Sequence, residues 1–267
     1  MSDAMQTDII LSRLPAAWRS YLADCTIGPV ATGMSGAFVF RLLTAECREQ
    51  YLKVAEGTAK AQLKQELDRT AWLDHQGIRV PRIARTYEGT QFVALLTEAL
   101  SGTPAEDRDG PADLVMHAIG RAFAELHALP VADCPFDESI EVRLRLAAEQ
   151  IAHGCVDSAE FDARNAGLTP VQLLNRLEAQ LPLTEDLVVA HGDATLSNVL
   201  VDPQGKIGFL DCGHAGRADR YVDLAVLTME IADVFGHEFV EIFLRAYGGA
   251  EWDNAKAAFF RDLYELF

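Results

Sequence analysis

The sequence predicts an α+β fold divided into two lobes, with a sheet-rich N-terminal lobe followed by a larger, mostly helical C-terminal lobe. Short segments rich in β-branched and aromatic residues gather in the N-terminal part, and segments with helical periodicity dominate afterwards. The chain of 267 residues is also near the size at which one hydrophobic core divides into two. We therefore expect an N-terminal lobe over residues 1–98 and a C-terminal lobe over residues 99–267.

The N-terminal lobe contains three segments with the composition of strands, each bounded by glycine or polar residues: 37–43, 50–54 and 92–96. The segment 60–75 carries a stripe of helical spacing and lies between the last two strands. Gly77 and Pro81 then supply stop signals for that helix. This order predicts a sheet accompanied by one main helix.

Helices are expected to make up most of the C-terminal lobe, which begins with a loop at residues 101–104. Asp113 is the expected cap of a helix that stops before Pro130, and Thr169 is the expected cap of a helix that begins at Pro170. The helices are expected over residues 113–129, 139–153 and 170–181. The one exception is a hairpin of residues 198–201 and 206–210 about a turn at 202–205.

Acidic residues outnumber basic ones, with 40 Asp and Glu against 23 Lys and Arg, which gives a formal net charge of -17. Such a charge repels polyanions and raises the concentration of cations near the surface. We therefore expect neither nucleic acid nor a membrane as a partner. A solvated acidic surface is the simpler interpretation of the charge taken alone, and a cationic substrate is the alternative.

The five cysteines are scattered without any CxxC pair, which argues against a disulfide framework and against a zinc site. We expect reduced thiols, as in cytoplasmic proteins. The first residues lack the basic start and long apolar core of a signal peptide, and no segment approaches the ~18 consecutive apolar residues of a membrane span. The expected location is the cytoplasm, as a monomer or a homodimer.

Two polar motifs flank the predicted hairpin. Asn198 follows the Asp193 of His191-Gly192-Asp193 by five residues and precedes Asp211 by thirteen. Phosphoryl transfer needs one carboxylate that orients the acceptor hydroxyl, and an amide oxygen and a second carboxylate that hold magnesium on the nucleotide phosphates. The alternative is that Asp193 and Asn198 only end a strand and cap a turn. Two motifs in this order at this spacing favour the chemical interpretation.

His-Gly-Asp-x4-Asn followed by Asp-x-Gly resembles the catalytic and metal-binding loops of the protein-kinase-like superfamily, in its aminoglycoside and choline kinase branch. The run from Gly208 to Ala225, together with the terminal Tyr264-Glu265-Leu266-Phe267, is similar to the aminoglycoside 3'-phosphotransferases. The resemblance extends from about Ser20 to Phe267. It implies a protein-kinase-like fold with an antiparallel N-terminal sheet, and transfer of a phosphoryl group from ATP, with Mg2+, to the 3'-hydroxyl of an aminoglycoside such as kanamycin or neomycin.

The resemblance also implies individual roles. Asp193 is the catalytic carboxylate, and Asn198 and Asp211 are the magnesium ligands. His191 is expected only to pack within its loop, because Asp193 makes a second base unnecessary. A kinase of another small alcohol, such as choline, a homoserine-like metabolite or a macrolide, is one alternative function. A nucleotide-binding pseudokinase is another, although a degenerate site would lack at least one of these residues.

A lysine inside a predicted strand indicates a nucleotide site in the N-terminal lobe. Lys53 lies between Leu52 and Val54, and an interior lysine is costly unless it is paired. Glu66 of the following helix is the expected partner, and Glu56 is the competing candidate, in a glycine-containing loop. A lysine held by a helical glutamate and directed at the α- and β-phosphates is the kinase arrangement. A surface lysine is the alternative.

Two further segments are assigned to the nucleotide by the resemblance. Gly33-Met34-Ser35-Gly36 would let backbone N–H groups approach phosphate oxygens, with Ser35 as the contact. From the residues alone an ordinary turn is the simpler interpretation. Thr97-Glu98-Ala99 resembles the inter-lobe hinge, where backbone groups of Thr97 and Ala99 pair with the edge of adenine.

An aminoglycoside is a polycation, so its pocket should be lined by carboxylates. The resemblance places substrate contacts in the regions of Glu160, Asp162, Glu230, Asp233, Glu265 and the α-carboxylate of Phe267. A solvated helix face is the alternative for each residue taken singly. His214 and Met229 stand where the family usually has arginine, which removes a fixed positive charge at two positions and bears on substrate range.

Overall fold

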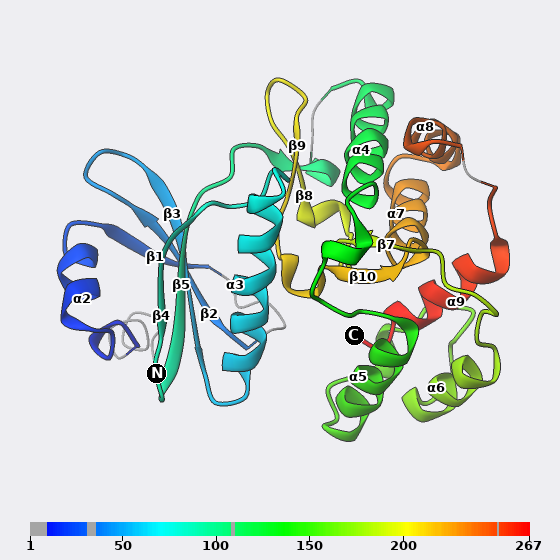
Figure 1. Ribbon diagram of the computed structural model, residues 1–267, viewed down its shortest axis with the longest axis horizontal. Helices are drawn as coiled ribbons and strands as arrows, with labels where there is room; N and C mark the ends of the chain where they lie inside the picture. Colours follow the sequence, from blue (N-terminus) through cyan, green and yellow to red (C-terminus); the bar gives the residue numbers. More distant parts are fainter. Residues whose placement is uncertain (1–9, 31–35, 108–109, 250) are drawn as a thin grey trace. The chain divides into compact units, whose positions relative to one another are not determined.

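The computed structural model describes residues 10–30, 36–107, 110–249 and 251–267, which form two compact units (Figure 1). The units divide between Ser101 and Gly102 rather than between residues 98 and 99. The cause is a set of long-range contacts, because the end of the first unit is tied to its sheet and to Arg79. The Ala99 N–H donates to Glu49 O at 3.0 Å, and Arg79 Nη2 donates to Ser101 O at 2.9 Å.

The first unit is built on an antiparallel sheet in the order β1-β2-β3-β5-β4. Its strands are β1 (Thr26–Val30), β2 (Phe38–Leu43), β3 (Glu49–Glu56), β4 (Ile83–Glu88) and β5 (Phe92–Glu98). The three predicted strands are confirmed as β2, β3 and β5. The two strands that the sequence analysis missed, β1 and β4, lie at the edges of the sheet. β1 contains Gly28 and Pro29, which weaken the signal of a strand and are tolerated at an edge.

Alternation along the central strands divides this unit into two hydrophobic clusters. On β3, Leu52 and Val54 pack with α2 (Ala16–Leu22), whereas Ala55 packs with α3 (Ala59–His75). Successive side chains of a strand point to opposite faces, so Lys53 shares the α3 face with Ala55. The predicted helix at residues 60–75 is thus confirmed as α3. The short helix α2 covers the other face of the same sheet (Figure 1).

The second unit is mostly helical, as predicted. Its helices are α4 (Ala112–His127), α5 (Ile140–Ala152), α6 (Pro170–Ala179), α7 (Tyr221–Val234), α8 (His237–Tyr247) and α9 (Asn254–Tyr264). Thr169 caps α6 and forms a capping box with Gln172, which confirms the predicted start. Asp113 does not cap α4: Pro111 holds that position and Asp113 lies in the first turn, where its charge still suits the helix dipole.

Two small sheets complete the second unit. The predicted hairpin is confirmed as β8 (Val199–Val201) and β9 (Ile207–Phe209), and β6 (Thr103–Pro104) extends it. A separate antiparallel pair joins β7 (Leu187–Ala190) to β10 (Gly216–Asp219). The expectation of a single hairpin here was wrong, because strands as short as β6 and β10 depend on their partners rather than on a periodic pattern. No helix in the described part of the chain is long and apolar enough to cross a bilayer.

Candidate active site

The predicted catalytic carboxylate and amide meet in the loop that joins β7 to β8. Asn198 ends a 3-10 turn, Leu196–Asn198, and its Nδ2 donates to Asp193 Oδ2 at 2.9 Å. The same Nδ2 donates to the Asp193 carbonyl oxygen at 3.0 Å. The amide nitrogen thus fixes both the backbone and the side chain of Asp193, and the Asn198 Oδ1 atom stays available to a cation.

Asp211 brings a second carboxylate to the same place. The Leu210 N–H donates to Asn198 O at 2.8 Å, which places Asp211 beside the residue that holds Asp193. Burial raises the pKa of Asp193, and the negative charge of Asp211 also raises it. Asp211 has a left-handed backbone conformation, with φ of 51° and ψ of 51°. A non-glycine residue held there is uncommon and marks a local constraint. The next residues form the 3-10 turn Cys212–His214.

Asp193, Asn198 and Asp211 together can accept a proton and bind a divalent cation. A buried carboxylate with a raised pKa is a suitable base for a hydroxyl group. The Asn198 oxygen and the Asp211 carboxylate are hard ligands that suit Mg2+, which takes its other ligands from water and phosphate. No group of three or more His, Cys, Asp or Glu side chains among the described residues could by itself hold a metal ion.

Asp223 of α7 holds the start of the loop that carries Asp193. Its fully buried carboxylate accepts the His191 N–H at 2.7 Å, the Gly192 N–H at 2.8 Å and His127 Nε2 at 3.0 Å. Burial alone would raise the pKa of Asp223, but the His127 hydrogen bond and the backbone donors lower it overall. The group therefore remains a carboxylate. Asp223 belongs to the run from Gly208 to Ala225 that resembles the family, but the sequence predicted no role for it.

A chain of buried polar groups continues from Asp223 to the surface. His127 Nδ1 lies 2.8 Å from the Tyr247 hydroxyl, which accepts a hydrogen bond from Arg220 Nη1 at 3.1 Å. Arg220 in turn pairs with Asp186 at 2.6 Å. Arg220 donates to the hydroxyl oxygen of Tyr247, and His127 links that hydroxyl group to the Asp223 carboxylate through its two ring nitrogens.

His191 packs within the loop, as predicted. Its Nε2 donates to Leu210 O at 2.8 Å, and its Nδ1 accepts the Asp193 N–H at 3.3 Å. His191 therefore links the loop before Asp193 to the strand end before Asp211.

Arg143 of α5 holds the same loop from another side, and sequence reasoning missed it. Its Nη2 donates to Gly192 O at 2.7 Å, and its Nε lies 3.6 Å from Glu138 Oε2. Both side chains are buried. Gly192 has a φ of 86°, and a Cβ there would lie 2.0 Å from His214 O. The loop is thus packed against the Asp211 turn as tightly as a glycine allows. A buried arginine on an otherwise amphipathic helix gives no distinct sequence signal.

Three of the predicted substrate residues lie near the catalytic loop. The Glu230 carboxylate accepts the Leu196 N–H at 2.5 Å, and burial raises its pKa, helped by the charges of Glu106, Asp193 and Asp233. Glu230 is therefore also a support of the loop, which its prediction as a substrate contact did not foresee. Asp233 is exposed one helical turn further along α7. The Phe267 ring lies 5.6 Å from the Arg143 guanidinium and 6.1 Å from the His214 ring.

Asp162 and Glu265 form a second group. The Asp162 N–H donates to Glu265 Oε2 at 3.2 Å, and Asn165 Nδ2 donates to Glu265 Oε1 at 2.9 Å. Tyr264 precedes Glu265, and burial raises its pKa, helped by the charges of Asp193 and Glu230. Glu160 is exposed at the end of the 3-10 turn Ser158–Glu160, apart from these contacts.

The nucleotide residues predicted in the first unit are placed as follows. Lys53 Nζ lies 2.7 Å from Glu66 Oε1, so the predicted ion pair is present, and Glu56 instead pairs with Arg13 at 2.7 Å. Ser35 lies outside the described residues. Thr97 is part of β5, and the Ala99 N–H is engaged by Glu49 O, which leaves the Ala99 carbonyl as its remaining polar backbone group.

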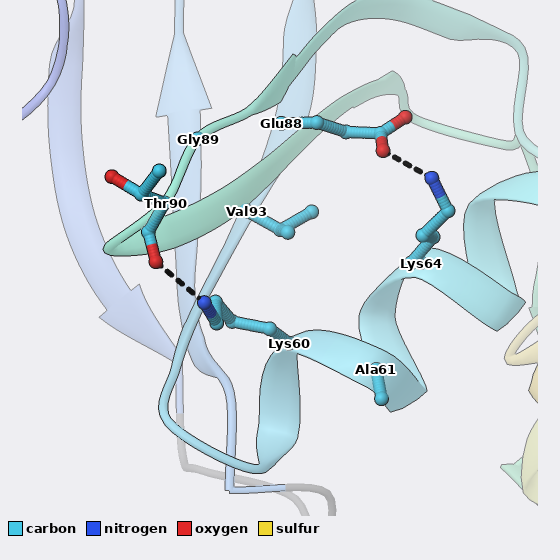
Figure 2. Close-up of a pocket in the computed structure, with 7 residues that line it drawn as sticks. All are labelled: Lys60, Ala61, Lys64, Glu88, Gly89, Thr90 and Val93. Carbon is cyan, nitrogen blue, oxygen red and sulfur yellow. Dashed lines mark hydrogen bonds and ion pairs between the residues drawn. The ribbon is translucent and has the colours of Figure 1, made fainter.

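A hollow of about 420 Å³ lies elsewhere on this unit, between the start of α3 and the turn from β4 to β5 (Figure 2). Lys60 Nζ donates to Thr90 O at 2.6 Å, and Lys64 pairs with Glu88. Figure 2 shows both lysines directed at these oxygens across the hollow. The hollow contains none of the predicted nucleotide residues.

Comparison with known proteins decides the family. Residues 26–260 match the family model described as "Phosphotransferase enzyme family". The chain belongs to this phosphotransferase family. The phosphotransferase is 38% identical over 250 residues to the aminoglycoside 3'-phosphotransferase of Streptomyces ribosidificus, covering 89% of this chain and 94% of the relative. It is also 37% identical over 218 residues to the streptomycin 3''-kinase of Streptomyces griseus, covering 78% and 79%.

Solved structures agree with the sequence matches. The phosphotransferase resembles the crystal structure of an aminoglycoside-3'-phosphotransferase of type VIII with a TM-score of 0.88 and 38% identity, over 97% of this chain and 98% of that one. The protein-kinase-like fold class that the sequence predicts is thereby confirmed. The recognition of the aminoglycoside phosphotransferases from two short motifs and a terminal tetrapeptide is confirmed as well.

We expect Arg143 of the phosphotransferase to position the loop that carries Asp193. In the variant Arg143→Gln the Gly192 carbonyl loses a charged donor and Glu138 loses a neighbouring positive charge, so kcat should fall at least about tenfold while the KM values change little. Thermal unfolding should show a destabilisation of about 3 kcal/mol. Arg145→Gln is the matched control, since Arg145 lies exposed on the same helix and pairs only with Glu149 at 3.2 Å. A kcat for Arg143→Gln equal to that of the control would contradict the role.

The Lys53–Glu66 pair gives a second expectation. Glu66→Gln should raise the KM for ATP about tenfold and leave the KM for the acceptor nearly unchanged, because Lys53 loses the charge that fixes its direction. Glu56→Gln is the control, since Glu56 lies at the end of the same strand but pairs with Arg13. Steady-state kinetics with each substrate varied in turn separate the two effects. An equal rise in the KM for ATP in both variants would speak against a special role of Glu66.

Proposed function

We propose that the protein is an ATP-dependent aminoglycoside 3'-phosphotransferase that transfers the γ-phosphoryl group to the 3'-hydroxyl of an antibiotic such as kanamycin or neomycin. The observation that carries the proposal is the convergence of Asp193, Asn198 and Asp211 in one loop system. The names of the relatives support the acceptor. A related enzyme bound to ADP and streptomycin, with a TM-score of 0.83 and 28% identity, supports the nucleotide.

In the proposed reaction Asp193 accepts the proton of the 3'-hydroxyl group. The substrate oxygen forms a bond to the γ-phosphorus as the bond from phosphorus to the oxygen bridging the β- and γ-phosphates breaks. The raised pKa of Asp193 makes it a better base than an exposed aspartate, and Asn198 Nδ2 fixes its direction. Asp223 and Arg143 keep the loop from moving during the step. Positioning of this kind supplies much of the rate in phosphoryl transfer.

Asn198 Oδ1 and Asp211 would hold Mg2+, which, when bound, reduces the negative charge on the phosphates. Lys53, held by Glu66, would contact the α- and β-phosphates, and Ser35 and its neighbours would add backbone donors. Adenine would meet the backbone of Thr97 and Ala99. For Ala99 this requires the carbonyl oxygen, or release of the N–H from Glu49.

The proposed acceptor site uses the acidic groups of the second unit. Glu230 and Asp233 lie near the loop that carries Asp193, Asp162 and Glu265 form a second group, Glu160 adds an exposed carboxylate on the segment before Asp162, and the Phe267 ring lies beside Arg143. Ammonium and hydroxyl groups of an aminoglycoside form charge-assisted hydrogen bonds with such carboxylates. The net charge of -17 then favours the encounter with a polycation and disfavours nucleic acid and anionic membranes. We infer a cytoplasmic enzyme, as its composition suggests.

One further acceptor is supported by a specific observation. Identity to the streptomycin 3''-kinase, 37%, nearly equals that to the 3'-phosphotransferase, 38%, although the matched share of the relative is smaller, 79% against 94%. The shared chemistry is transfer to a sugar hydroxyl, and the position on the antibiotic differs. We favour the 3' position because the longer match includes more of the chain.

A coupled assay of ATP consumption tests the proposed acceptor. We expect turnover with kanamycin and neomycin and none above background with a 3'-deoxy aminoglycoside, which lacks the oxygen that accepts the phosphoryl group. Streptomycin serves as the competing acceptor in the same assay. Turnover with streptomycin alone would replace the proposal by the 3'' assignment, and turnover with none of them would reject both.

Asp193 gives a sharper test of the chemistry. Asp193→Asn should lower kcat by at least about 1000-fold, because the hydroxyl loses its base while the fold is retained. For the wild-type enzyme, kcat/KM should fall as the pH decreases through the raised pKa of Asp193, since only the ionised carboxylate accepts the proton. The acid limb of the pH profile should therefore lie above the usual range of aspartate. An active Asp193→Asn enzyme would refute the assigned role.

A further inference from the structure

Two carboxylates that the proposed function assigns to the substrate already hold a cation of the chain itself. Arg164 Nη2 lies 3.0 Å from Asp162 Oδ2 and 3.6 Å from Glu265 Oε1. Its Nε lies 3.1 Å from Asp262 Oδ1. One guanidinium group thus contacts three carboxylates at once, as an ammonium or guanidinium group of a bound ligand would.

A second arginine in the same network has a different place. Arg176 Nη2 donates to Asp262 Oδ2 at 2.8 Å and also to Asn165 Oδ1. Asn165 itself is buried and donates from Nδ2 to Asp262 Oδ1 at 3.0 Å. Arg176 therefore supports Asp262 from α6, and it makes none of the contacts that Arg164 makes with Asp162 and Glu265. Asp262 keeps a positive partner when Arg164 moves away.

Arg164 is also the more exposed member of its ion pairs with Asp262 and Glu265. Its side chain is 37% exposed, against 12% for Asp262 and 10% for Glu265. A long charged side chain with this much contact with water loses little when it exchanges one partner for another. The two mostly buried carboxylates, in contrast, stay where the fold holds them. The cation is thus the part of the network that can move.

Positive charge around Asp162 is reinforced by Arg261 of α9. Arg261 Nη2 donates to Thr228 Oγ1 at 3.1 Å and its Nε donates to Ala225 O at 3.2 Å. Burial lowers the pKa of Arg261, and the charge of Arg164 lowers it further, as expected for two neighbouring guanidinium groups. Arg261 is fixed by α7, whereas Arg164 lies on the segment between the 3-10 turn Ser158–Glu160 and α6.

We propose that Arg164 is a specificity-determining residue, an internal cation that competes with an ammonium group of the acceptor for Asp162 and Glu265. The inference rests on the proposed function, because it takes these carboxylates as part of the acceptor site. A polycationic acceptor must displace the guanidinium group to reach them. Arg164 thereby weakens the binding of acceptors that place an ammonium group at these carboxylates. It weakens the binding of acceptors that place a hydroxyl group there to a smaller extent.

The test compares wild-type protein with Arg164→Gln, using neomycin and kanamycin as ligands of the nucleotide-free chain in isothermal titration calorimetry. We expect the Kd for neomycin to fall about three- to tenfold, and the Kd for kanamycin, which carries fewer ammonium groups, to fall less. The gain should disappear at high salt, since it is electrostatic. In turnover the KM should fall with the Kd while kcat stays the same.

Three variants separate competition from other effects. Arg145→Gln removes an exposed arginine of α5 that pairs with Glu149, and it should leave both Kd values unchanged. Arg164→Lys keeps a cation and should stay near the wild-type Kd. Asp162→Asn combined with Arg164→Gln should lose most of the gain, because the released carboxylate is then absent. Thermal unfolding of each variant checks that the fold is retained.

The outcomes keep the two proposals distinguishable. Turnover of kanamycin by the wild type, together with an unchanged or higher Kd for neomycin in Arg164→Gln, would overturn the role of Arg164 and leave the proposed function intact. An equal fall in Kd for Arg145→Gln would show that the overall charge of the protein explains the effect, and it would also overturn the role of Arg164. If neither antibiotic binds to either protein, both the proposed function and the role of Arg164 fail together.

Discussion

The hydrogen bonds between Asp223 and two consecutive backbone amides are the constraint on which the rest of the candidate site depends. One buried carboxylate accepts the N–H groups of His191 and Gly192 and thereby fixes the loop immediately before Asp193. A charged acceptor in a site without water makes strong hydrogen bonds, and leaving these amides unpaired would be costly. The backbone before Asp193 is therefore held by α7, a helix that itself contributes Glu230 to the same loop, and Asn198 Nδ2 fixes the Asp193 side chain.

The second constraint is the close packing of the two motif loops on each other. Gly192 touches the carbonyl oxygen of His214, and the His191 ring donates to Leu210 O just before Asp211. The spacing of Asp193, Asn198 and Asp211 along the chain therefore becomes a fixed arrangement in space. The like charges of Asp193 and Asp211 repel each other, and a cation placed between them would remove that repulsion.

The sequence alone predicted the fold class and the chemical trio, because both depend on local patterns. Lys53 inside a predicted strand needs a partner, and Glu66 at the edge of the apolar stripe of the next helix was the natural candidate. The roles of Asp223 and Arg143 could not be found in this way, since each acts on a loop through contacts over 31 to 49 positions of the chain.

Edge strand β1, with Gly28 and Pro29, also lacked a local signal. The tie of Ala99 to Glu49, which displaced the boundary between the units, is again a long-range contact.

The lack of space at Gly192 restricts which substitutions this protein can accept during evolution. With a φ of 86° and no room for a Cβ, position 192 tolerates no side chain, and its neighbours are held almost as tightly. The acidic groups at Asp162 and Glu265 lie on other segments and contact a partly exposed arginine. With Asp162 and Glu265 in the acceptor site that we propose, heritable variation in drug range can accumulate on these segments while the loop of Gly192 stays unchanged. The loop around Gly192 and the segments that carry Asp162 and Glu265 are therefore separate targets of natural selection.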